Sequence, residues 1–236
     1  MLIISTHAAL RKGYYIEFSF LNEILTHNKF DYYYIRHSLW GDFNSNFNLY
    51  LNGISKKEST LFTIKKPAPL RYITNIISTV IFLLKYAKRE NSNYIFIGIN
   101  PLNALAGLIL KKCNKIHKVV FYTADYSHKR FNNFLLNTIY HRIDKYCACE
   151  ADQVWNVSTR IQMVREQLGT EKSRNIFVPN VPPLHLTSKI NSKHVKTTLI
   201  SLGALKTHLD YYGLFDAVSI LNNLSLIHIS EPTRPY

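Results

Sequence analysis

One carboxylate, Asp125, follows the apolar run 119–122 and precedes a polar turn that contains His128, Lys129 and Arg130. The apolar run has the composition of a buried β-strand. Ligands of parallel α/β sheets bind beyond the carboxyl ends of the strands, so a carboxylate there can bind hydroxyl groups or transfer a proton. We therefore predict that Asp125 is catalytic and that Lys129 and Arg130 hold an anionic group. The alternative is that Asp125 only caps the turn by accepting hydrogen bonds from backbone amides.

An amphipathic helix is predicted after this turn. Phe131, Leu135, Ile139, Ile143 and Cys147 recur every four residues and predict one apolar face. The opposite side carries the polar residues Asn133, Asn137, His141, Asp144 and Lys145. A second unit of strand 154–157, helix 158–168 and strand 175–180 follows. Asn156 and Ser158 fall at the carboxyl end of its first strand, where a ligand would bind.

The earlier part of the chain also alternates between strands and helices. Strands are predicted at 2–6, 31–36, 47–51, 60–64 and 94–98, and a polar turn at 55–60. Helices are predicted at 14–28, from 65–69 to about 89, and at 100–112. The second of these helices in chain order has an apolar face that is expected to pack on the core and consists of Ile73, Ile76, Ile77, Val80, Leu84 and Ala87. The alternative is that this helix lies on an anionic membrane. Asn100 is predicted to cap the helix that begins at Pro101.

Strands that alternate with helices predict an α/β fold with a Rossmann-like parallel sheet and helices on both faces. The loop 7–13 holds one glycine, Gly13, preceded by Lys12, and the Gly-x-Gly-x-x-Gly pattern of dinucleotide-binding loops is absent from the sequence. Dinucleotide binding therefore has little support.

The order of these elements, and above all residues 125–131, 137–144, 151–158 and 178–180, resembles the amino-terminal half of a family 4-like glycosyltransferase. Such enzymes have two Rossmann-like domains that face a cleft, the GT-B fold. The resemblance implies an acceptor-side domain at 1–180, a linker at 181–196 and the first strand and helix of a nucleotide-sugar-binding domain at 197–223.

The resemblance also implies roles for individual residues. The family transfers a sugar from a nucleotide-sugar donor to a saccharide or lipid-linked acceptor, usually with retention and without a metal or a further cofactor. The acceptor would contact Lys12, Gly13, Asn100, His128, Lys129, Arg130, Asn156 and Ser158. The donor would contact Gly203 and Lys206. Two features depart from the family: Asp125 stands near the place of a cleft histidine, and Gly213 follows Tyr212 where the family often has Lys-Gly.

Residues 224–234 resemble the in-frame translation of a transposase sequencing adapter, so residues 224–236 are expected to be non-native. On this interpretation the natural protein continues past Asn223, and the 236-residue chain lacks the donor half and is inactive alone.

The formal charge of +14 is concentrated in residues 51–200, which carry 23 basic and 8 acidic residues. An anionic membrane surface is therefore a candidate partner. The alternative is that the charge only reflects an overall bias of the sequence toward lysine. Nucleic acid is disfavoured because no helix-turn-helix, zinc-finger or RNP-like signature is present. The rival functions are a non-catalytic basic binding module and a sugar-nucleotide epimerase of the same fold. Three cysteines favour a reducing compartment, so we expect a cytoplasmic protein, at most peripheral on the inner face of the membrane.

Overall fold

The computed structural model describes residues 1–9, 16–86, 93–180, 212–213 and 215–220. The chain separates into one unit at Met1–Ser188 and another at Lys189–Tyr236. In the second unit, residues 212–213 and 215–220 are helical and lie in the segment 197–223, for which a strand and then a helix were predicted. Lys12, Gly13, Gly203 and Lys206 lie outside the described residues, as do the linker, residues 197–211 of the predicted second domain and the adapter-like tail.

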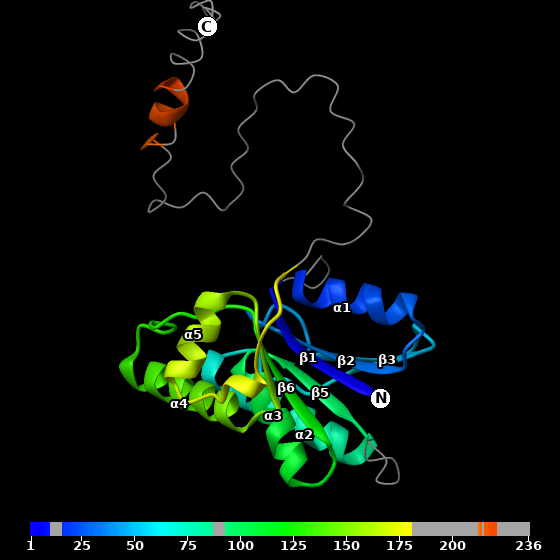
Figure 1. Cartoon of the computed structure of the whole chain (residues 1–236). Coiled ribbons are helices and arrows are strands. Elements are labelled where there is room, and N and C mark those ends of the chain that lie inside the picture. Colours follow the sequence, from blue (N-terminus) through cyan, green and yellow to red (C-terminus); the bar gives the residue numbers. More distant parts are fainter. Residues whose placement is uncertain (10–15, 87–92, 181–211, 214, 221–236) are drawn as a thin grey trace, which may run out of the picture. The chain divides into compact units, whose positions relative to one another are not determined.

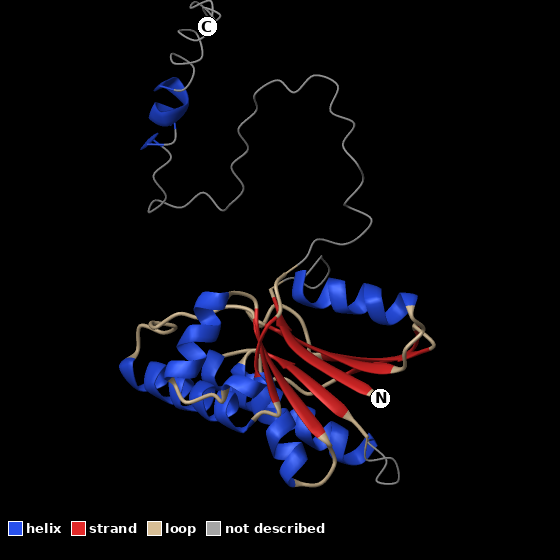
Figure 2. Cartoon of the chain, in the orientation of Figure 1, coloured by secondary structure: helices blue, strands red, loops and turns tan. Residues whose placement is uncertain are grey.

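An eight-stranded sheet forms the centre of the first unit (Figures 1 and 2). Its strand order is β4-β3-β2-β1-β5-β6-β7-β8. The six strands from β2 to β8 in this order are parallel, and β3 and β4 add an antiparallel hairpin beside β2. The predicted α/β, Rossmann-like fold is thus confirmed. The strands are β1 (Leu2–Ala8), β2 (Tyr32–Ser38), β3 (Asn46–Leu51), β4 (Ile54–Thr60), β5 (Ile95–Ile99), β6 (Lys118–Thr123), β7 (Gln153–Asn156) and β8 (Asn175–Phe177).

Helices cover both faces of the sheet. One face carries α1, and α2, α3 and α4 lie on the other (Figure 1). The helix α5 is tied to α4 by an ion pair between Arg165 and Asp144. The helices are α1 (Ile16–His27), α2 (Ala68–Tyr86), α3 (Pro101–Lys112), α4 (Phe134–Glu150) and α5 (Thr159–Gln167), and a short 3-10 helix, η1 (Lys172–Arg174), precedes β8.

The central strands are apolar on both sides because both sides are buried. On the α2–α4 side, Ile3, Phe96 and Phe121 belong to one core cluster. On the α1 side, Ile4 and Tyr122 belong to another. Successive residues of a strand point to opposite faces, so a continuous apolar run such as 119–122 serves both cores.

The position of β4 corrects the sequence prediction. A polar turn was expected at 55–60 with a strand after it, whereas the structure has the strand at Ile54–Thr60. This strand is the edge of the sheet and most of its residues are exposed. Charged residues such as Lys56, Lys57 and Glu58 suit an exposed edge, and they remove the apolar alternation from which strands are predicted.

The helix α4 corrects a second prediction. Of its predicted apolar face, Cys147 is buried and Ile143 packs against the core, but Leu135 and Ile139 are 65% and 46% exposed. Asp144, which was expected on the polar side, is buried together with Cys147. The buried carboxylate has an arginine partner from another helix, which helical periodicity cannot reveal.

The helix α2 corrects a third. Of the predicted core face, Ile76 and Val80 are partly buried and pack against the core, but Ile73, Ile77 and Leu84 are 51%, 49% and 38% exposed. The residues that α2 buries are mostly polar, namely Arg71, Asn75, Ser78, Thr79 and Leu83. Among the described residues, no helix is long and apolar enough to cross a membrane.

Candidate functional site

β1 and β5 are neighbours in the middle of the sheet, and the strands that follow each of them lie on opposite sides. From β1 the chain adds β2 on one side, and from β5 it adds β6, β7 and β8 on the other. In open α/β sheets, the crevice beyond the carboxyl ends of two such strands is the usual ligand site. His7 lies at this end of β1, and Asn100 directly follows β5. The two side chains meet there, since His7 Nδ1 is 3.1 Å from Asn100 Nδ2.

The imidazole of His7 is held by amides from three places in the fold. Its Nδ1 is also 2.9 Å from Asn103 Nδ2, and its Nε2 is 3.2 Å from Asn75 Nδ2. Burial, together with the charge of Arg71, lowers the pKa of His7 to about 3. The ring is therefore neutral near pH 7 and is too weakly basic to act as a general base. Its role is to position the amides around it.

The backbone of Asn100 is strained. Its φ of 78° and ψ of 162° lie in a region that only glycine adopts without strain. Its Oδ1 accepts a hydrogen bond from the Asn103 amide at 3.3 Å, which confirms the predicted cap of α3. Such strain persists only where the surroundings impose it, and it clusters at ligand sites. Asn100 is half-buried at the crevice, and its role in ligand binding stays a prediction.

A second buried histidine continues the network toward β3 and α2. His37 Nδ1 is 2.8 Å from Ser45 Oγ, and its Nε2 is 2.9 Å from Thr79 Oγ1. The rings of His37 and His7 are 5.3 Å apart, and burial holds the pKa of His37 well below its usual value. Arg71 donates hydrogen bonds from its guanidinium to the carbonyl oxygens of Leu39, Trp40 and Lys65. The network thus fixes the loops around the crevice.

Asp125 lies two residues beyond β6 and is exposed. Its Oδ2 is 2.5 Å from Arg130 Nη1, so the carboxylate and the guanidinium that were predicted together form an ion pair. In the crevice, the ring of Tyr72 packs edge-on against His7, with the ring centres 5.5 Å apart.

Side chains of α4 and α5 contact the turn between β6 and α4. The carbonyl oxygen of His128 accepts hydrogen bonds from His141 Nε2 at 2.9 Å and Asn137 Nδ2 at 3.2 Å. The guanidinium of Arg165 lies 5.2 Å from the ring centre of Tyr126. His128 and Lys129 keep their side chains exposed above this support.

Asn156 and Ser158 have structural partners instead. The Nδ2 of Asn156 donates to Asn175 Oδ1 at 2.7 Å, and the side chain is fully buried. The Oγ of Ser158 accepts from the Ile161 amide at 3.2 Å and caps α5. The structure thus offers Asn100, Asp125 and the 128–130 turn to a ligand, while Asn156 joins β7 to β8.

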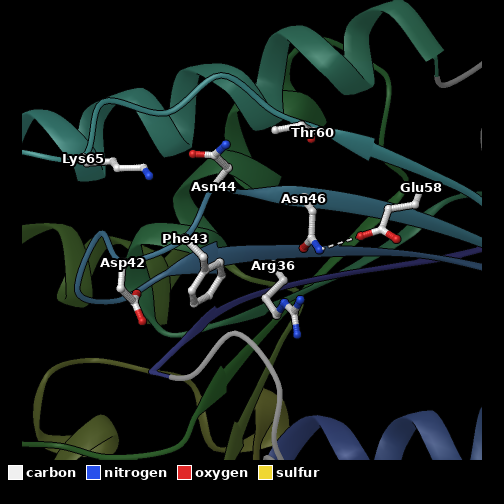
Figure 3. Close-up of a pocket in the computed structure, with 8 residues that line it drawn as sticks. All are labelled: Arg36, Asp42, Phe43, Asn44, Asn46, Glu58, Thr60 and Lys65. Carbon is white, nitrogen blue, oxygen red and sulfur yellow. Dashed lines mark hydrogen bonds between the residues drawn. The ribbon is translucent and has the colours of Figure 1, made fainter.

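A polar pocket of about 400 Å³ lies near the same edge of the sheet, where β2 and β4 end and β3 begins (Figure 3). Within it, Asn46 Nδ2 donates to Glu58 Oε1 at 3.1 Å, and the Arg36 guanidinium lies 5.4 Å from the ring centre of Phe43. Carboxylates, amides and cations together can bind a ligand with many hydroxyl groups. The lining residues are Arg36, Asp42, Phe43, Asn44, Asn46, Glu58, Thr60 and Lys65.

Sequence reasoning missed both His7 and this pocket. His7 was assigned to a loop because the first strand was ended at Thr6, although strand ends are the places to search for ligand residues. The pocket was hidden because Glu58 and Thr60 were placed around a turn. In the described part of the chain, no cluster of histidine, cysteine and acidic residues could hold a metal ion.

Comparison with protein-family models gives no match to this chain. Comparison with curated proteins gives none either.

Proposed function

We propose that this chain is the acceptor-binding part of a glycosyltransferase that moves a sugar from a nucleotide-sugar donor to a saccharide or lipid-linked acceptor. The observation that carries the proposal is the strained Asn100, which meets His7 at the point where the strand order reverses. Its half-buried amide can bind acceptor hydroxyl groups, and His7, neutral near pH 7, holds it in place.

The Asp125–Arg130 pair adds the groups that the reaction needs. The carboxylate of Asp125 accepts hydrogen bonds from acceptor hydroxyl groups and can take part in proton transfer. Arg130 and Lys129 bind an anionic acceptor or the leaving phosphate. The polar pocket around Arg36 and Glu58 would extend the contacts to further sugar units. We place the protein in the cytoplasm, consistent with its three free cysteines.

Acceptor binding is the direct test. The purified 236-residue chain is mixed with a panel of neutral and phosphorylated oligosaccharides, and binding is measured by saturation-transfer difference NMR. Asn100→Gly removes the amide without a cost in backbone strain, and Asp125→Asn removes the charge. Each should weaken binding about tenfold, the effect of one lost hydrogen bond to a ligand.

Glu171→Gln is the matched control. Glu171 is an exposed carboxylate, 64% accessible against 61% for Asp125, and it pairs with Arg174 at 3.3 Å. Its replacement should leave binding unchanged. If no oligosaccharide binds, or if all three variants bind like the parent chain, the proposed site is wrong.

A further inference from the structure

The outer side of α2 presents apolar side chains. Leu70, Ile73, Ile77, Ile81 and Leu84 follow one another at intervals of three or four residues, and each is between 38% and 61% exposed. Residues at these spacings form a continuous row on a helix surface. We call this set the α2 outer row. The inner side of α2 carries the buried polar residues described above, together with Leu83, Ile76 and Val80, which contact the core.

Further apolar side chains extend the α2 outer row on both sides. A groove of about 240 Å³ between α2 and α4 is lined by Ile73, Ile76, Ile139 and Ile143 among others, with scarcely any polar surface. On the other side, Phe62 and Ile81 line a second, mostly apolar groove. Phe62 is 71% exposed, and Phe134 and Leu135 at the start of α4 are 85% and 65% exposed. A contiguous apolar surface of this kind marks a binding face.

The charges around this face have one predominant sign. The α2 sequence from Ala68 to Tyr86 contains no aspartate or glutamate. Exposed Lys65 and Lys66 precede the helix, and Lys85 lies in its last turn. At that end, the ammonium groups of Lys57 and Lys85 lie 5.4 Å and 5.6 Å from the ring centre of Tyr86. Apolar residues bordered by lysines and an aromatic ring suit the boundary between acyl chains and anionic headgroups.

We propose that the α2 outer row, with Phe62 and the start of α4, docks the protein onto the surface of an anionic lipid bilayer. A second copy of the chain fits this face poorly, because two such faces would bring lysines of the same sign together. A bilayer accommodates both features, since its headgroups attract the lysines and its acyl chains accept the isoleucines. The proposal does not depend on the reaction that the crevice supports.

Vesicle flotation tests the proposal with the whole 236-residue chain. Binding is compared on pure phosphatidylcholine vesicles and on vesicles with about 30 mol% phosphatidylglycerol, at about 0.05 M and about 0.5 M salt. We expect binding to the anionic vesicles at low salt, and weaker binding both on neutral vesicles and at high salt.

The double variant Ile77→Glu with Ile81→Glu should lower the partition coefficient at least about tenfold, because both side chains would no longer enter the acyl region. Both are exposed, so the fold should survive, which circular dichroism checks. The matched control is Ile24→Glu, which changes an isoleucine that is 38% exposed on α1, the helix of the opposite face. It should bind like the parent chain.

Two outcomes would overturn the proposal. One is equal binding of the parent chain and the Ile77/Ile81 variant to anionic vesicles. The other is a parent chain that does not bind vesicles but forms a dimer in sedimentation velocity, while the double variant is a monomer. That result would mean that the face binds a second copy of the chain. Saccharide binding is measured separately on the same variants, so failure of one proposal leaves the other standing.

Discussion

Replacement of Asp144 by asparagine tests how the base of the candidate site is held together. The carboxylate of Asp144 and the guanidinium of Arg165 are paired through both oxygens, with side chains only 4% and 1% exposed. Asparagine has the same size, but its amide group would face the guanidinium with a donor. Arg165 would then be a buried cation without a counter-charge, next to one amide oxygen, Thr123 Oγ1 at 3.4 Å and the rings of Phe121 and Tyr126.

The cost of breaking a buried pair from one side is about 3–5 kcal/mol. With a urea m-value of about 2 kcal/mol/M, the unfolding midpoint should fall by about 1.5–2.5 M. The assay is equilibrium urea unfolding followed by circular dichroism. Asp125→Asn is the matched control, since it makes the same change in an exposed Asp–Arg pair, and it should cost less than about 1 kcal/mol.

A second comparison separates pairing from packing. If an uncompensated charge causes the loss, Asp144→Leu combined with Arg165→Met should recover most of the stability, because apolar replacements of a buried pair are often neutral or stabilising. Equal midpoints for Asp144→Asn and Asp125→Asn would refute the reasoning, and so would a double variant that is less stable than Asp144→Asn.

Two further predictions concern the crevice. The pKa of His7 is lowered to about 3, so between pH 6.5 and pH 3 the unfolded chain binds more protons than the folded chain, and the free energy of unfolding should fall on acidification by about 1.4 kcal/mol per pH unit. The lowered pKa of His37 acts in the same direction. The free energy of unfolding is measured with urea at pH 7 and pH 5, and it should change less with pH in His7→Gln than in the parent chain. An equal change in both would exclude a contribution from His7. Gly98→Ala should lower the free energy of unfolding by at least about 2 kcal/mol, because the added Cβ would lie 2.4 Å from the backbone nitrogen of Ala104 in α3. Thermal unfolding measures the loss, and a midpoint equal to that of the parent chain would contradict this packing.

Local sequence patterns were sufficient to predict the secondary structure of segments whose surroundings are the same along their whole length. The run 119–122 is apolar throughout because β6 is buried on both sides, and the Asn100-Pro101 pair carries the signal of a helix start. Periodicity was misleading where partners lie far apart in the sequence. Asp144 is polar and was expected at the surface, yet its partner Arg165 comes from another helix.

The same limit applies to the candidate site. Asp125 and Arg130 are five residues apart, so their association could be predicted from the sequence. His7 and Asn100 are 93 residues apart, and only the pairing of β1 with β5 brings them together. The strained conformation of Asn100 likewise depends on the tertiary structure, and nothing in the local sequence indicates it.

The apolar residues of α2 lie on two sides of the helix, and this has a consequence for folding. Leu83, Ile76 and Val80 contact the core, whereas Ile77 and Ile81 are exposed, so apolar burial alone does not fix the rotation of the helix about its own axis. The observed rotation also places Asn75 beside His7 and Thr79 beside His37 at hydrogen-bond distance, and lets Arg71 donate to three loop carbonyl oxygens. These partners lie on β1, on β2 and in neighbouring loops, so they exist as a set only after those strands have paired. We therefore expect α2 to acquire its final rotation late in folding, with the isoleucine side competing for the sheet until the histidines are in place.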